Sequence, residues 1–238
     1  MLHRGGTFFL MKKSRFFFYL LFFYVFLFIV LPPILSQFFL KGSSVTIGKY
    51  PLSTFILAFI SILIYLFSRK GLVFEEKFES KKLAFFQYSA SAMTTFGILC
   101  LSSVIFESLS YFFKLDSGIA NVLFPKSFWQ TINFILGVIC AALFEEIIYR
   151  FYLPLAFKEL FIKSKFYNNL KLSVIIEVFS ILLFALPHLY LGLLGFLNAL
   201  VCGFALRMCM LKTNSLWICL IVHGSYNFFA LGLMALIG

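Results

Sequence analysis

The chain has 238 residues, of which 62% are hydrophobic, 12% are charged and 36 are phenylalanine. Its mean hydropathy of +1.02 excludes a soluble globular protein, so we expect an integral membrane protein embedded in a lipid bilayer. The formal net charge of +11 indicates contact with anionic headgroups rather than nucleic acid, because every basic cluster adjoins an apolar run and no nucleic-acid-binding motif is present.

Seven apolar runs follow one another along the chain, and a membrane span needs about 20 apolar residues. The first run follows four basic residues and is too long for the roughly 7–15-residue core of a signal peptide, so we expect it to be retained. Pro32 and Pro33 should kink or end it. The predicted spans are residues 16–40, 51–68, 84–106, 128–157, 172–187, 189–206 and 215–237.

This pattern predicts an all-α fold, a polytopic transmembrane helical bundle of about seven spans, with eight as the alternative count. The fifth and sixth spans are short and share the corner Leu186-Pro187-His188. Residues 1–238 contain no internal repeat, low-complexity linker or soluble segment, so we expect one domain. All five cysteines lie in apolar runs without a C-x-x-C pair, which favours packing roles over disulfides or zinc binding.

Lysines and arginines alternate in number from one connection to the next. The amino-terminal tail has four, residues 69–82 five, residues 158–171 four, and Arg207 with Lys212 two, whereas the opposite connections have four in all. Because positively charged loops stay cytoplasmic, fifteen against four predicts a cytoplasmic amino terminus and, with seven spans, an external carboxyl terminus. We therefore expect a multi-pass protein of the cell (plasma) membrane.

Glu145, Glu146 and Arg150 interrupt the fourth apolar run, although ionisable groups at membrane depth are costly and usually functional. On a helix, Glu146 and Arg150 are four residues apart in the order that favours an ion pair, and Glu145 is turned from Glu146 by about 100°. One carboxylate should therefore stay ionised beside the guanidinium, while the other suits proton transfer. Taken alone, the triplet is equally consistent with a buried cluster that only fixes helix packing.

Two of the three histidines lie in or beside later apolar runs. Phe184 and His188 are four residues apart, as are His223 and Asn227, so each pair projects from one helix face. With the carboxylates, these residues supply a base, candidate acids and an amide donor, the set needed to add water to a carbonyl. Three further residues could line the same cavity, although packing is their more common role: Tyr190, Asn198 and Tyr226.

These motifs resemble those of the CPBP intramembrane proteases, which include type II CAAX prenyl endopeptidases and Abi-type bacteriocin-processing or immunity proteins. The family has E-E-x-x-x-R, F-x-x-x-H and H-x-x-x-N/B in this order, and the chain has all three complete, at residues 145–150, 184–188 and 223–227. The tract K-T-N-S-L-W at residues 212–217 is similar to the family's T-G-S-L-W, with asparagine in place of glycine. The resemblance covers residues 128–237, a protease-like motif core that is specific as an ordered set.

The resemblance implies hydrolysis of a peptide bond within the membrane by a glutamate-activated water. By motif position, Glu145 corresponds to the general base, and His188 to a partner that positions the water or transfers a proton. His223 and Asn227 would hold the oxyanion of the tetrahedral intermediate. The implied partners are a membrane-associated peptide or membrane-protein substrate and the lipid bilayer, while the sequence indicates no oligomeric state.

Glu146 and Arg150 would then form a supporting ion pair, and Phe184 completes the supporting set. No H-E-x-x-H zinc motif is present and the resemblance favours a metal-independent site, so we expect no cofactor. The alternative is zinc, for which three residues are candidate ligands: Glu145, His188 and His223.

Two other functions compete with this interpretation. In a non-proteolytic immunity or scaffold protein of the same family, the polar cluster would only hold the helices together. The complete motif set argues against this alternative. A proton-coupled transporter is a second alternative, against which stands the absence of repeat symmetry between the halves. Bacterial origin, expected from the compact chain with its short loops, would make peptide precursors, bacteriocin leaders or membrane-protein segments better substrates than prenylated proteins.

Helix lengths raise a conflict within this site. Glu145 should lie near the cytoplasmic side of its span, whereas His188 counts about 24 Å from the cytoplasmic start of the fifth span. Either the fifth helix begins nearer Glu177, or the spans tilt and Pro187 bends the chain back toward the middle of the bilayer.

Overall fold

The computed structural model describes residues 19–39, 51–71, 81–115, 125–161 and 170–237. Within these ranges the chain is helical and has no strand, which confirms the predicted all-α class. All five cysteines are free and lie within helices, as expected for packing residues. The helices are η1 (Phe26–Val30), α2 (Leu31–Phe39), α3 (Pro51–Gly71), α4 (Lys81–Phe113), α5 (Phe128–Glu145), η3 (Glu146–Tyr152), α6 (Leu153–Phe161), α7 (Leu170–Ala185), η4 (Leu186–Leu191), α8 (Gly192–Thr213) and α9 (Leu216–Ile237).

By length and composition, five helical stretches in the described part of the chain could cross a membrane. One of them, Leu170–Thr213, contains both α7 and α8, and a shorter apolar helix lies at Leu52–Ser68 within α3. The chain is therefore a multi-pass membrane protein, and the exact count of seven or eight spans stays a prediction. Each continuous helical stretch whose first residue is described starts within three residues of the start of a predicted span. The ends differ more, because α4 and α8 each end seven residues later than predicted.

A proline pair locally widens the first helix without ending it. In the π-helix η1 the amide of Leu31 donates to the carbonyl of Phe26, five residues back. Pro32 follows directly, and proline lacks an N–H while its ring collides with the carbonyl four residues earlier. A π-turn relieves this collision by adding one residue to the turn. The helix then continues through α2 to Phe39.

A second π-helix followed by a proline lies in the helix that carries Glu145, Glu146 and Arg150. α5, η3 and α6 form one continuous helical stretch, Phe128–Phe161. In the π-helix η3 the amide of Leu153 donates to the carbonyl of Ile148, and Pro154 follows. All seven residues of η3 are buried, so the widened turn lies in the core of the bundle rather than against lipid.

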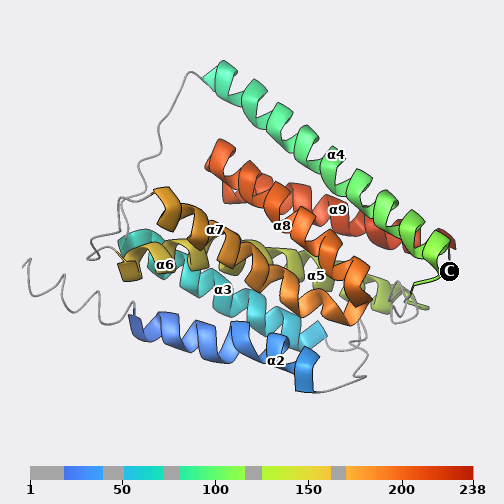
Figure 1. Cartoon of the computed structure of the whole chain (residues 1–238), viewed down its shortest axis with the longest axis horizontal. Coiled ribbons are helices and arrows are strands. Elements are labelled where there is room, and N and C mark those ends of the chain that lie inside the picture. Colours follow the sequence, from blue (N-terminus) through green and yellow to red (C-terminus); the bar gives the residue numbers. More distant parts are fainter. Residues whose placement is uncertain (1–18, 40–50, 72–80, 116–124, 162–169, 238) are drawn as a thin grey trace, which may run out of the picture.

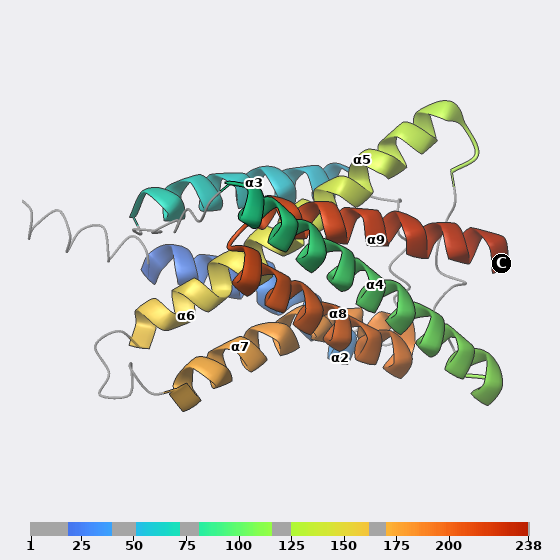
Figure 2. The same ribbon diagram turned by 90° about the horizontal axis from the view of Figure 1, so that it is seen from above.

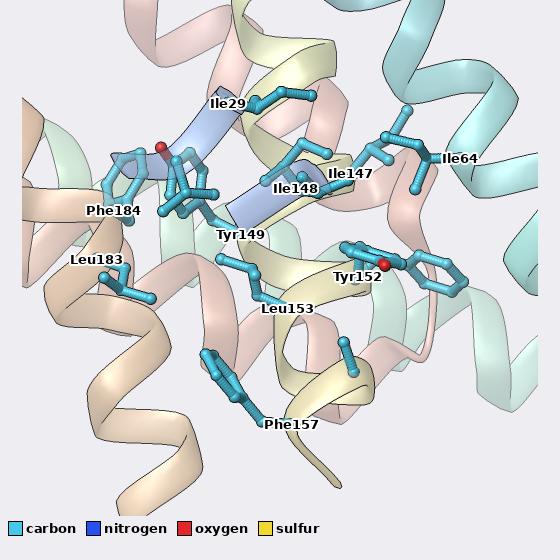
Figure 3. Packing of buried hydrophobic residues seen from close by; sticks show 14 of the residues in the cluster. Ile29, Ile64, Ile147, Ile148, Tyr149, Tyr152, Leu153, Phe157, Leu183 and Phe184 are labelled. Carbon is cyan, nitrogen blue, oxygen red and sulfur yellow. The ribbon is translucent and has the colours of Figure 1, made fainter. Parts of the chain in front are cut away.

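η3 is the centre of the larger apolar core. α3 packs along α5 and η3, while α7 and α9 contact η3 from other directions. Figure 3 shows Ile147 beside Ile64 of α3, whereas Tyr149 faces Phe184 of α7. Ile29 of η1 belongs to the same cluster. The first two helical stretches, which carry no family motif, therefore help to enclose the segment that holds the glutamates.

α7 and α8 are the two arms of a helical hairpin (Figures 1 and 2). Phe184 of α7 lies against Gly203 of α8, where an added Cβ would come within 3.0 Å of the ring. Glu177, earlier in α7, binds Arg207, later in α8, so the arms are antiparallel. The 3₁₀ helix η4 forms the turn and ends at Leu191, and the next residue, Gly192, has a φ of 77° in the left-handed region that favours glycine.

Candidate active site

His223 of α9 lies between the two adjacent glutamates of the central helix. Its Nδ1 is 2.7 Å from Oε1 of Glu146, and its Nε2 is 3.5 Å from Oε2 of Glu145. With the ring proton on Nδ1, the imidazole donates to Glu146 and turns Nε2 toward Glu145. The fold thus brings together two motifs that are 77 residues apart in the sequence.

The two glutamates have different environments, as helix geometry predicted. The Glu146 side chain is fully buried, whereas that of Glu145 is 23% exposed. Oε1 of Glu146 also lies 3.5 Å from Nε of Arg150, the expected pair at i, i+4. Glu146 is therefore held by a cation and an imidazole, and Glu145 is the carboxylate that a water molecule or a substrate can reach.

Phe184 of α7 is the apolar support of this cluster. The guanidinium carbon of Arg150 lies 3.6 Å from the centroid of the Phe184 ring, which is a cation–π contact. The rings of His188 and His223 pack against the same phenyl group, with centroids 4.9 Å and 6.4 Å away. The first residue of the F-x-x-x-H motif therefore contacts residues from both other motifs.

The cluster retains unused hydrogen-bonding capacity. Both terminal nitrogens of Arg150 and Oε2 of Glu146 are buried and make no hydrogen bond to another described residue. An unpaired buried polar group costs about 1–3 kcal/mol. These atoms therefore favour a polar neighbour such as a water molecule or a peptide group.

His188 reaches the site from the turn η4. Its Nδ1 is 3.0 Å from the carbonyl oxygen of Phe184, a contact that fixes the orientation of the ring. The Glu145 carboxylate interacts electrostatically with His188 and with Tyr190, whose rings stack at a centroid distance of 6.4 Å. Of the three residues that could line the cavity, Tyr190 therefore lies beside the motif residues.

The conflict in depth between Glu145 and His188 disappears once the helix ends are known. Glu145 is 16 residues from Phe161, about 24 Å along the helix, and His188 is 18 residues from Leu170, about 27 Å. The placement of Glu145 near the cytoplasmic side was wrong, because the central helix extends to Phe161 and its midpoint, not its end, carries the glutamate. α7 begins at Leu170 rather than near Glu177, so the first of the two explanations is wrong as well.

Asn227 is half-buried and follows His223 by one helical turn on the same face of α9. No hydrogen bond holds its carboxamide to another described residue. Its role as a donor at the site stays a prediction.

Asn198 and Tyr226, which could have lined the same cavity, belong instead to a separate polar cluster, in line with the packing role that was the more common expectation. The hydroxyl of Tyr226 is 2.6 Å from that of Ser103, and Nδ2 of Asn198 donates to Tyr226 Oη at 3.0 Å. Ser102 donates to Oδ1 of Asn198 at 2.6 Å. Because these groups satisfy one another, they connect α4, α8 and α9 in the manner of polar contacts between membrane helices.

A second ion cluster lies beside the site and was not predicted. Arg207 binds Glu177 through Nε at 2.5 Å and Nη2 at 2.8 Å, and Lys158 Nζ lies 2.9 Å from the same carboxylate. The assignment of Lys158 and Arg207 to charged connections was wrong, because α6 and α8 extend past residues 157 and 206 and carry both within helices, where they pair with Glu177. The available signal was Glu177, a lone carboxylate in the predicted span 172–187.

The geometry of the described residues offers no ready metal site. No group of three or more His, Cys, Asp or Glu side chains among them could hold a metal ion. The nitrogens of His223 face two carboxylates, and Nδ1 of His188 faces a backbone carbonyl. Catalysis without a metal stays a prediction, and zinc stays its alternative.

The fold and the cluster define a multi-pass helical membrane protein with glutamate, histidine and arginine side chains gathered in its core. Residues 127–229 match the family model of Rce1-like type II CAAX prenyl endopeptidases. This stretch includes all seven motif residues, so the part of the chain that carries the site is similar to this family of CAAX-type proteases. The chain matches no curated protein and no solved structure.

Proposed function

We propose that the protein is an intramembrane endopeptidase that hydrolyses peptide bonds of membrane-associated peptides or proteins. The observation that carries this proposal is the placement of Glu145. It is the exposed member of an otherwise buried pair of carboxylates, it lies 3.5 Å from His223, and it interacts electrostatically with His188. A general base needs such access to water together with neighbouring groups that handle the proton.

In the proposed reaction Glu145 removes a proton from water, and the hydroxide attacks the carbonyl carbon of the scissile bond. Asn227 donates to the carbonyl oxygen as charge develops on it, and so does Nε2–H of His223 when the ring carries a proton on both nitrogens. When the tetrahedral intermediate collapses, the C–N bond breaks and the proton passes from Glu145, with His188 as relay, to the leaving nitrogen. The products are one new carboxyl group and one new amine, which accounts for all atoms of the water.

Isotope labelling tests this reaction directly. The purified protein in lipid nanodiscs is incubated in H₂¹⁸O with a library of membrane-anchored peptides, and the fragments are analysed by mass spectrometry. We expect fragments whose new carboxyl group carries oxygen-18, because the attacking oxygen comes from the solvent. Unlabelled fragments, or labelled fragments that form equally with a Glu145→Gln variant, would contradict the proposal.

A chelator separates carboxylate-activated water from metal-activated water. We expect EDTA or phenanthroline to leave the rate of cleavage unchanged, because the carboxylate of Glu145 supplies the base. A zinc hydrolase would instead lose its activated water together with the metal. Reproducible loss of cleavage that added zinc restores would assign the ion to the alternative ligand set of Glu145, His188 and His223.

We further propose that the protein lies in a bacterial plasma membrane with its amino terminus in the cytoplasm. The lysine and arginine bias supports this orientation, even when Lys158 and Arg207 are removed from the count. Peptide precursors, including bacteriocin leaders, and segments of membrane proteins are the proposed substrates. An immunity or scaffold protein without proteolytic activity is the competing function.

A further inference from the structure

The carbonyl oxygen of Arg150 has lost its normal partner within the helix. In an α-helix it would accept a hydrogen bond from the amide of residue 154. That residue is Pro154, which has no N–H, and the chain forms the π-turn of η3 immediately before it. The lost bond lies in the same turn as the side chains of Glu146 and Arg150.

Arg207 of α8 supplies the missing donor. Its Nη1 donates to the carbonyl oxygen of Arg150 at 2.6 Å, over a sequence separation of 57 residues. Nε and Nη2 of the same guanidinium bind both carboxylate oxygens of Glu177. The Arg207 side chain is only 10% exposed, so these contacts form away from solvent. One guanidinium thereby fixes the backbone of η3 to both arms of the hairpin.

We infer that Arg207 is a positioning residue that holds η3 so that Glu145 and Glu146 face the two nitrogens of His223. The inference rests on the proposed function. The π-turn is one residue wider than an α-turn, and a shift between these two forms would rotate one part of the central helix against the other. The bond to the carbonyl oxygen of Arg150 fixes the register at the last residue of the Glu145, Glu146 and Arg150 cluster. The two hydrogen bonds to Glu177 hold the Arg207 guanidinium in place.

Two neighbouring basic residues allow a matched test. Arg207→Met removes all three bonds of the guanidinium at similar length, and Glu177 keeps Lys158 as a partner. Lys158→Gln removes a cation from the same carboxylate but leaves the bond to Arg150. If Arg207→Met folds poorly, Arg207→Lys serves instead. A single ammonium keeps the charge beside Glu177 but cannot form the paired hydrogen bonds that the guanidinium makes to its carboxylate.

The experiment measures kcat, KM and the pH profile of kcat for each purified variant, normalised to the folded fraction. The substrate is one membrane-anchored peptide from the library that the wild type cleaves. For Arg207→Met we expect kcat to fall about 10²-fold, as for a misplacement of about 1 Å at a catalytic group, with KM changed less than about twofold. The pH profile of kcat should shift as well, because the surroundings of Glu145 change. For Arg207→Lys we expect a fall in kcat of about tenfold, which corresponds to one hydrogen bond of a charged group. Lys158→Gln should match the wild type in all three measurements.

Retention of kcat within about threefold by both Arg207 variants would overturn the inference, as would an equal loss in Lys158→Gln or a loss explained by the folded fraction alone. Glu145→Gln, measured in parallel, separates this failure from failure of the proposed function. If Glu145→Gln abolishes cleavage and the Arg207 variants do not, only the positioning role is wrong. If cleavage persists in Glu145→Gln, both the proposed function and the positioning role are wrong.

Discussion

Glu145→Gln is expected to reduce proteolysis by about 10²–10⁴-fold while the protein accumulates in the membrane at its normal level. Glutamine has the shape and polarity of glutamate but no basic carboxylate, so water loses its proton acceptor. Stability should change little, because the side chain is partly exposed and its contact to His223 is long, at 3.5 Å. The measurement is cleavage of a co-expressed membrane peptide, normalised to the amount of protein.

Glu107→Gln is the matched control for this variant. It makes the same isosteric change at a half-buried carboxylate of another apolar helix, α4, outside the site. We expect it to cleave at the wild-type rate. An immunity or partner-binding assay should be run on the same cells. If Glu145→Gln protein is as abundant as the wild type and retains the full phenotype, the scaffold function is correct and the hydrolase is not.

The helices and the motif residues could be predicted from the sequence because both are encoded locally. Long apolar runs define the helices, and the spacing of four residues puts Phe184 with His188, and His223 with Asn227, on common faces. The cost of ionisable groups in a membrane then indicates that the motifs meet. In the structure, two of the motifs meet where His223 contacts both glutamates.

The π-turn and the second ion cluster could not be predicted because they depend on contacts between distant residues. Pro154 in an apolar run is compatible with a helix end, a kink or a π-turn, and the packing around η3 selects among them. The pairing of Glu177 with Arg207 requires the register of the hairpin, which the turn at η4 determines. Lysine and arginine near a predicted helix end were therefore interpreted as loop charges.

Glu146→Gln is expected to act on folding rather than on the chemical step alone. The side chain of Glu146 is fully buried and is shared by Arg150 and His223. Neutralising it leaves the guanidinium of Arg150 as an uncompensated charge, and breaking a buried ion pair in this way costs about 3–5 kcal/mol. We therefore expect lower abundance and a lower melting temperature, together with a loss of cleavage. Thermal unfolding of the purified variants in detergent provides the measurement.

Removing the arginine as well distinguishes this charge effect from a simple loss of packing. In Glu146→Gln with Arg150→Met, no uncompensated charge remains, and replacement of a buried pair by apolar groups is often neutral for stability. We expect the double variant to regain most of the lost stability but not the cleavage, because His223 has still lost its carboxylate partner. If the double variant is as unstable as Glu146→Gln, the pair acts through shape rather than charge. If it regains cleavage, the Glu146 carboxylate is not needed to orient His223.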